Sequence, residues 1–243
     1  MVAKSDAVVN YSSNFSDHNL LSSATHVVKG RSDCVCEFYF LALKKSVLAV
    51  IAILIAHFSI AQQLSSEERK FLIDLLEADS KKFLGNIENI SDQQWNFKPS
   101  SDAWSVAQIS EHIALSEDLL YAIAQKTLLT PPEEEKAEAL AGHEKELLVA
   151  VMDRSSKAEA PEVLNPNGKF ASKKELIEVF KAARQQTINY VRTNSDPLKN
   201  HVARHPVFGE LTAYQWLIFI AGHADRHVAQ LEEVKKNVNF PKM

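Results

Sequence analysis

The chain has 243 residues, a length that suits one large domain or two small ones. Only six residues are glycine, and no alternation of apolar and polar residues dominates, so a β-rich fold is disfavoured. Lysine and arginine number 27 against 31 aspartates and glutamates, and the formal net charge of -4 comes without a long basic block. Nucleic acid is therefore disfavoured as the principal partner.

Residues 44–61 have the form of a secretory signal peptide. Two lysines precede the apolar run 47–56, and Ser59 and Ala61 place small side chains just before Gln62. The apolar run is too short for a comfortable transmembrane span. We therefore expect export, to the periplasm or the medium, with membrane anchoring as the alternative if the segment stays uncleaved.

Residues 1–43, which precede this segment, carry no motif and have no domain assignment. One hypothesis is that translation starts near Leu43, so that residues 1–42 are not part of the protein. The alternative is a long amino-terminal region or a signal anchor. The only cysteines, Cys34 and Cys36, precede the cleavage site, so the mature chain needs neither a disulfide nor a reducing compartment.

Four long amphipathic helices are predicted in the mature chain, each with its own start signal. A serine or threonine with a glutamate or glutamine three residues later marks each start: Ser65 with Glu68, Ser105 with Gln108, Ser172 with Glu175, and Thr212 with Gln215. The last helix runs to about Lys236, where Lys235 and Lys236 suit the helix dipole. The fold class predicted for residues 62–243 is all-α, a four-helix bundle.

The segments between these helices are predicted to be mostly irregular. Residues 133–168 form an insertion between the second and third helices, in which residues 140–152 can make a short extra helix. Residues 205–209 are expected to be the last loop. The apolar stripes of the helices predict the core, which includes Phe71, Leu75, Ile109, Phe180, Trp216 and Ile220.

His223 and His227 are the strongest functional signal in the chain. Their spacing places both imidazoles on one face of the last helix, within an apolar stripe. Two interpretations stay open: a shared metal ion, or two core histidines that are hydrogen-bonded to neighbours. A zincin-type protease is disfavoured because Ala224 occupies the position of the general-base glutamate. A ferritin-like di-iron site is disfavoured because no Glu-x-x-His spacing includes these histidines.

A third histidine would complete such a site, because catalytic zinc usually takes three protein ligands and a water. His112 is the natural candidate, since it lies along the second helix between the core positions Ile109 and Ile113. Metal ligands in bundles commonly come from facing helices. On its own His112 is more often a hydrogen-bonded core residue, so its interpretation as a ligand depends on the histidine pair.

Three stretches together resemble the DinB-like (DinB/YfiT-like) superfamily of metalloenzymes. They are residues 95–113, which contain Trp95, Pro99, Trp104 and Glu111-His112-Ile113; residues 205–212, which begin His-Pro-Val-Phe-Gly; and residues 222–230, which contain His-Ala-Asp-Arg-His. The resemblance covers most of residues 65–240. It implies a four-helix bundle that holds a metal with one histidine of the second helix, His112, and two of the last, His223 and His227.

The resemblance also implies a class of activity. Members with an assigned reaction are similar to thiol-dependent S-transferases or isomerases that use small thiols. This chain departs from them in its signal peptide and in the length of residues 133–168, which can reshape the mouth of a pocket. The expected function is an exported metal-dependent enzyme, of the thiol S-transferase or hydrolase type, with zinc or nickel on three histidines. The alternatives are a non-catalytic metal or small-ligand binding module of the cell envelope, and a purely structural bundle.

Roles for the other residues follow from helical geometry. No general base is assigned, because Glu111 should point away from the site. Gln230, one turn after His227, either supports that ring or is a polar neighbour in the core, and the second interpretation is slightly favoured. His143, His201 and His205 are expected in a surface helix or in loops. The expected partners are a small-molecule substrate, which can be a thiol, and a second copy of the chain in a homodimer.

Overall fold

The computed structural model describes residues 43–53, 63–155 and 160–242, and the chain divides into two compact units, Met1–His57 and Phe58–Met243. In the first unit, residues 43–53 are helical. The cysteines and the proposed cleavage site lie outside the described residues, so those predictions stay predictions. None of the helices formed by the described residues has the length and apolar character needed to cross a membrane.

The second unit is built on four long helices, as predicted. They are α2 (Ser66–Ile87), α4 (Val106–Thr127), α7 (Lys173–Thr193) and α8 (Ala213–Lys235). Each begins directly after its predicted cap, whose hydroxyl accepts a hydrogen bond from the backbone N–H three residues on. In α2, α4 and α8 the glutamate or glutamine side chain also accepts from the N–H of the cap residue, which completes the capping box.

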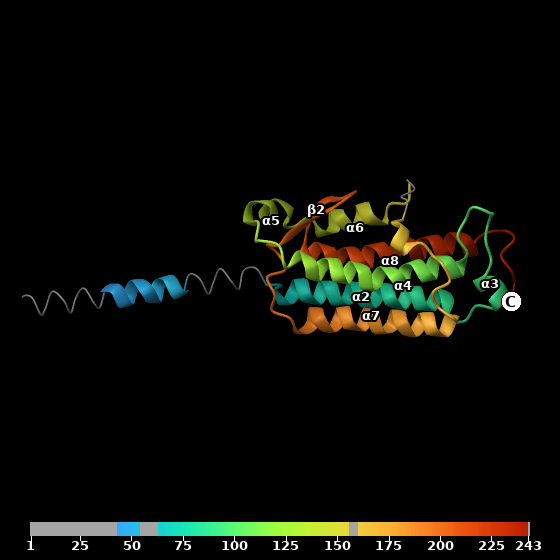
Figure 1. Ribbon diagram of the computed structural model, residues 1–243, viewed down its shortest axis with the longest axis horizontal. Coiled ribbons are helices and arrows are strands. Elements are labelled where there is room, and N and C mark those ends of the chain that lie inside the picture. Colours follow the sequence, from blue (N-terminus) through green and yellow to red (C-terminus); the bar gives the residue numbers. More distant parts are fainter. Residues whose placement is uncertain (1–42, 54–62, 156–159, 243) are drawn as a thin grey trace, which may run out of the picture. The chain divides into compact units, whose positions relative to one another are not determined.

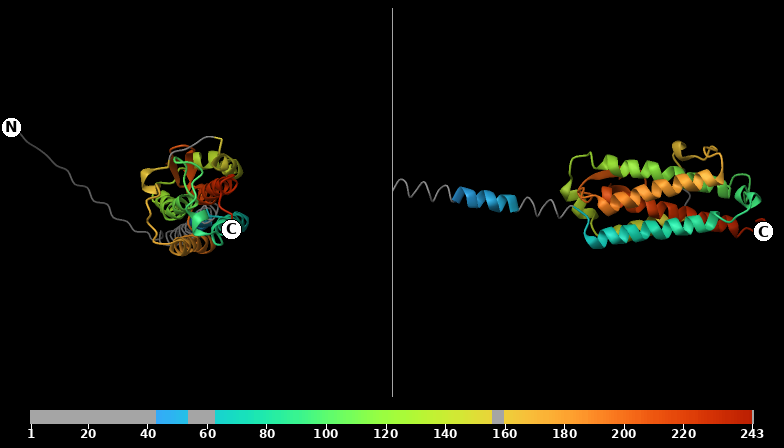
Figure 2. Two further views of the ribbon diagram at one scale, coloured as in Figure 1. Left: turned by 90° about the vertical axis from the view of Figure 1, so that its right-hand side faces the viewer. Right: turned by 90° about the horizontal axis from the view of Figure 1, so that it is seen from below.

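The helices do not pack in chain order. Both α2 and α4 lie against α7 on one side and α8 on the other, so α2 and α4 occupy opposite corners of the bundle (Figures 1 and 2). Figure 1 also shows that α4 and α7 run opposite to α2 and α8. Four of the six predicted core residues are buried, whereas Phe71 and Leu75 are only partly buried against the same core.

A buried ion cluster ties three of the helices together. Arg184 of α7 donates to both oxygens of Glu117 in α4, at 2.9 and 2.6 Å, and to Asp79 in α2 at 2.5 Å. All three side chains are about 2% exposed. Burial raises the pKa of both carboxyls, and Arg184 opposes the rise; the pKa of Asp79 is raised to about 7. One guanidinium balances a single negative charge, so we assign the ionised carboxylate to Glu117, which accepts two bonds from it.

The segments between the long helices contain more regular structure than predicted. A short helix α3 (Asp92–Trp95) precedes α4, and the insertion contains α5 (Glu134–Leu140), α6 (Glu144–Met152) and a 3-10 turn η1 (Glu162–Leu164). The single helix predicted for residues 140–152 is therefore wrong at its start. Gly142, at φ 82°, separates α5 from α6, because a positive φ interrupts a right-handed helix.

The last loop is also more ordered than predicted. Strands β1 (Val202–His205) and β2 (Gly209–Thr212) form an antiparallel hairpin in which His205 pairs with Gly209, and the second strand leads directly into α8. Gly209 closes the turn with φ 76°, a conformation that few residues except glycine adopt readily.

The insertion covers one side of α8. Helix α6 packs along α8, and a Cβ at Gly222 would lie 3.1 Å from Leu148 and 3.2 Å from Val151, both on α6. Glycine at this position therefore permits the close approach of the two helices, directly before the first histidine of α8.

Candidate metal centre

The three histidines singled out in the sequence come together in the bundle. The Nε2 atom of His112, on α4, lies 3.2 Å from Nε2 of His223 and 3.1 Å from Nε2 of His227, both on α8. One nitrogen of each ring falls within a group that could hold a metal ion. His112 is buried, and the two histidines of α8 retain some exposure.

Hydrogen bonds at the opposite nitrogens fix the tautomers of two of these rings. His112 Nδ1 lies 3.0 Å from the carbonyl oxygen of Leu164, and His227 Nδ1 lies 2.8 Å from Oε1 of Gln230. Both oxygens can only accept, so each Nδ1 carries the proton. In the neutral rings Nε2 therefore presents a lone pair, and the two lone pairs face one another across 3.1 Å.

The surroundings keep the rings neutral. Burial, together with the nearby His112, lowers the pKa of His227 to about 3. The pKa of His223 lies well below its usual range, mainly because the ring is buried and also because the imidazoles of His227 and His112 lie close to it. Burial also lowers the pKa of His112. A proton shared among the rings is thus disfavoured, while the converging lone pairs repel one another unless a cation lies between them.

The spacing of the nitrogens fits such a cation. At a zinc–nitrogen distance of about 2.0–2.1 Å, two ligating nitrogens lie about 3.3 Å apart in a tetrahedral arrangement and about 2.9 Å apart at right angles. The observed 3.1 and 3.2 Å fall between these limits. Imidazole nitrogen is a donor suited to zinc, copper, iron or nickel rather than to magnesium or calcium.

Aromatic rings flank the cluster on two sides. The indole of Trp104, at the start of α4, lies 5.1 Å from the ring of His112, and Phe219 stacks on His223 at 5.8 Å, centroid to centroid. Trp104 thus packs directly on a member of the cluster.

The insertion supports the cluster from the outside. Besides the bond from His112 to Leu164, both oxygens of Glu111 accept backbone N–H groups, from Asn167 and Lys169 at 3.0 and 2.8 Å and from Gly168 at 3.1 Å. The prediction that Glu111 points away from the site is confirmed. Its carboxylate instead holds the end of the insertion against α4.

Gln230 supports one of the three histidines. Gln230 is not merely a polar neighbour in the core, because its amide oxygen accepts the Nδ1 proton of His227. An i, i+3 pair on a helix can make such a contact, and this spacing was the available signal. The two residues between the α8 histidines make contacts elsewhere: Asp225 pairs with Lys82 of α2, and Arg226 donates to the carbonyl oxygens of Val151 and Asp153.

The other three histidines among the described residues differ in position. His143 is exposed at the start of α6, as expected. His201 lies outside the helices and strands, as expected, but it is buried, with its Nδ1 2.7 Å from the carbonyl oxygen of Thr130. His205 lies at the end of β1, half-buried among aromatic rings, and burial lowers its pKa. Only His143 is therefore a suitable surface control.

Known proteins are similar to this chain in sequence. The model of the DinB superfamily matches residues 75–231. The uncharacterized protein YuaE of Bacillus subtilis (strain 168) is 30% identical over 152 residues, which are 63% of this chain and 90% of that protein. The solved structure of YfiT from Bacillus subtilis, described as a probable metal-dependent hydrolase with an unusual four-helix bundle topology, is 18% identical, with a TM-score of 0.49 over 73% of this chain and 91% of its own. The family match includes α4 and the part of α8 that carries both of its histidines, and the chain belongs to the DinB superfamily.

Proposed function

We propose that the domain binds a divalent transition-metal ion through Nε2 of His112, His223 and His227. We further propose that it acts on a small molecule as a metal-dependent enzyme of the thiol S-transferase or hydrolase type. The observation that carries the proposal is the convergence of three neutral imidazoles, two with tautomers fixed so that their lone pairs face each other at 3.1 Å.

Three neutral imidazoles favour zinc or nickel and leave positions open for other ligands. When bound, such an ion supplies Lewis acidity, which favours deprotonation of a thiol or water near neutral pH. The residues of the chain provide the rest. The carbonyl of Leu164 and the amide of Gln230 orient two of the donor rings, and the rings of Trp104 and Phe219 restrict water around them.

A second candidate function is a non-catalytic metal or small-ligand binding module of the cell envelope. It is favoured because no carboxylate of the described residues belongs to the cluster. Glu111, which adjoins His112 in the sequence, uses both oxygens to hold residues 167–169. Export through the signal-like segment 44–61 is part of both proposals, and so is assembly into a homodimer.

The metal content of purified protein tests the first step. We expect near-stoichiometric metal in the wild type and loss of most of it in each of His112→Ala, His223→Ala and His227→Ala, because two imidazoles hold a divalent cation far less well than three. His143→Ala, an exposed histidine on the insertion, is the matched control and should keep the metal. Metal-free wild type, or unchanged content in all three variants, would contradict the proposal.

The reaction class is tested next. Thiol-conjugation substrates and ester substrates should be offered to the metal-loaded and the metal-free protein. Turnover that depends on the metal supports an enzyme. Stoichiometric metal without turnover across both substrate classes supports the binding module instead.

A further inference from the structure

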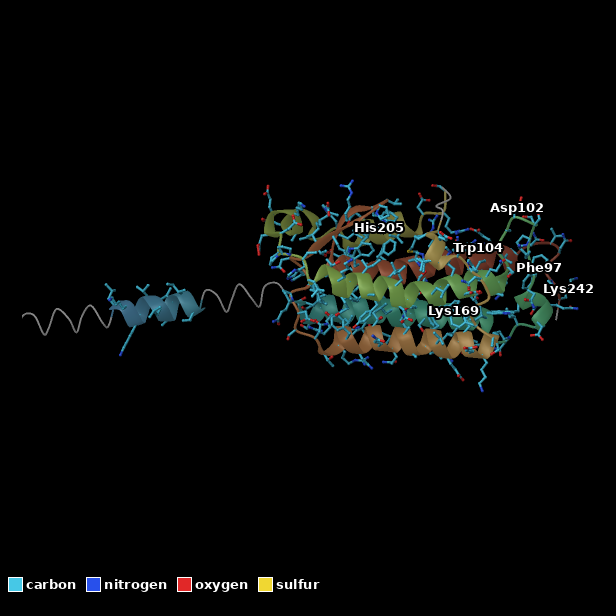
Figure 3. The ribbon with its side chains drawn as sticks, in the orientation of Figure 1. Phe97, Asp102, Trp104, Lys169, His205 and Lys242 are labelled. Atoms are coloured by element: carbon cyan, nitrogen blue, oxygen red, sulfur yellow. The ribbon has the colours of Figure 1, made fainter. Side chains whose placement is uncertain are left out.

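His205 is a polar side chain in an aromatic cluster that adjoins the three-histidine site. Its ring lies 4.9 Å from Phe208, 5.2 Å from Trp216 and 4.7 Å from Phe219, centroid to centroid. It belongs to the His-Pro-Val-Phe-Gly stretch of the sequence, to which the proposed metal site gives no role. In Figure 3, His205 and Trp104 both lie toward the edge of the bundle that carries α6.

The hairpin turn fixes the tautomer of this ring. The backbone N–H groups of Val207 and Phe208 both donate to His205 Nδ1, each at 3.1 Å. Since Nδ1 accepts, the neutral ring carries its proton on Nε2 and can donate there. Nothing in the described part of the chain accepts a hydrogen bond from this Nε2.

A second N–H donor belongs to the same cluster. Trp216 is 3% exposed, and its buried Nε1 has no hydrogen-bond partner among the described residues. An N–H group that is buried without an acceptor costs free energy, which an acceptor supplied by a ligand would recover. The cluster is therefore apolar in its walls and offers two donors, as small-molecule sites commonly do.

The cluster connects to the metal centre through one ring. Trp216, Phe219 and His223 follow one another on one face of α8, and Phe219 packs on His205 at 4.7 Å and stacks on His223 at 5.8 Å. The sum of these two distances is the upper limit for the separation of the two imidazole centroids. A small molecule can reach across a separation within this limit.

We propose that His205 binds the substrate: its Nε2–H donates a hydrogen bond to a carboxylate or carbonyl oxygen of a small molecule whose other end lies at the three-histidine site. This inference rests on the proposed metal site. It specifies the substrate class as a compound with an oxygen acceptor a few bonds from the group that meets the metal, and it assigns a binding function to the conformation of the hairpin.

Two substitutions separate this role from a purely structural one. In His205→Asn the side-chain oxygen takes the place of Nδ1 and can accept the N–H groups of the turn, but no donor reaches as far as Nε2. In His205→Gln the side-chain amide can donate from near the position of Nε2, while the acceptor for the turn is lost. A binding role requires the donor, whereas a structural role requires the acceptor.

The experiment uses full-length protein loaded with Co²⁺ and the probes mercaptoacetate, mercaptopropionate and mercaptobutyrate, each paired with the plain alkanethiol of similar length. Thiolate binding is followed by the visible absorption of the Co²⁺ site. In the wild type we expect at least one mercaptocarboxylate to bind about tenfold more tightly than its plain thiol, the size expected for a hydrogen bond to a charged group. The preference should disappear in His205→Asn and survive in part in His205→Gln.

Other outcomes identify which proposal fails. If the wild type takes up Co²⁺ but binds every pair equally, the role of His205 is refuted and the metal site stands. The role is refuted equally if His205→Asn keeps the preference while His205→Gln loses it. If the wild type takes up no Co²⁺, the metal site itself fails, and the inference built on it fails too.

Discussion

The ion cluster at the centre of the bundle leads to a quantitative stability prediction. Replacing Arg184 with methionine keeps an unbranched apolar side chain but removes both hydrogen bonds that the guanidinium gives to Glu117 and the one it gives to Asp79. Breaking a buried ion pair by removing one partner costs about 3–5 kcal/mol, because the remaining charge stays desolvated.

A limit on this cost follows from the pKa of the remaining carboxyl. Glu117 can take up a proton instead of staying ionised, and with a reference pKa of about 4.3 this costs about 3.7 kcal/mol at pH 7, at 1.36 kcal/mol per pH unit. The folded-state pKa of Glu117 in the variant lies above the unfolded one. The loss of stability in the variant is therefore present at neutral pH and becomes smaller as the pH is lowered. At pH 5 the cost of protonating Glu117 is only about 1 kcal/mol.

Urea denaturation followed by far-UV circular dichroism at these two pH values measures the effect. The matched control is Arg192→Met, on the same helix, whose ion pair with Glu77 is about half exposed on both sides and should contribute about 0–1 kcal/mol. The wild-type protein is measured at the same two pH values, so that the pH dependence of stability that the buried histidines cause is subtracted from that of the variant. A loss in Arg184→Met no larger than that in the control, or one that is unchanged between the two pH values, would refute the reasoning.

Four further predictions concern the site, the core and export. Gln230→Leu should weaken metal affinity about 10–100-fold, by removing the acceptor that orients His227, and a metal titration with affinity unchanged would contradict that role. Metal-free protein should lose stability as the pH falls from about 6.5 toward 3, because burial lowers the folded-state pKa of the clustered histidines and the unfolded chain therefore binds more protons. Thermal melts across this range should show the loss. Bound metal should be released from the loaded protein as the pH falls through the same range. Trp216→Ala should cost about 3–5 kcal/mol in urea unfolding, and a loss below about 1 kcal/mol would mean that the ring is not a core residue. Mass spectrometry of the native protein should find Gln62 at the amino terminus, and recovery only in the cytosol with residues 44–61 intact would contradict export.

The helices could be predicted because their signals are local. A capping box needs only two side chains three residues apart, and all four long helices begin where such a pair predicted. The His223–His227 pair was visible for the same reason, since helical periodicity alone puts the two rings on one face. The approach of His112 is not local, and its prediction depended on the expectation that bundle ligands face one another.

The hairpin could not be recognised in this way. Its strands have four residues each, too few for an alternating pattern to stand out, and His205-Pro206 suggests a turn by composition. The strands are stabilised by pairing with each other and by the packing of Phe208 and His205 on α8, contacts that depend on the folded bundle. The assignment of His205 to a loop followed from this missing information.

The dependence of the cluster on the insertion was equally invisible in the sequence, and the reason is chemical. The group that sets the tautomer of His112 is a backbone carbonyl, at Leu164, and every residue type carries one. Glu111, the neighbour of His112 on α4, binds the backbone N–H groups of residues 167–169 and so fixes the same segment a few residues further on. Two consecutive side chains of α4 thus hold the end of the insertion, and the insertion in turn determines which nitrogen of His112 faces the other histidines. A change in the insertion that moved this carbonyl would alter the donor set of the cluster without touching any of its three histidines.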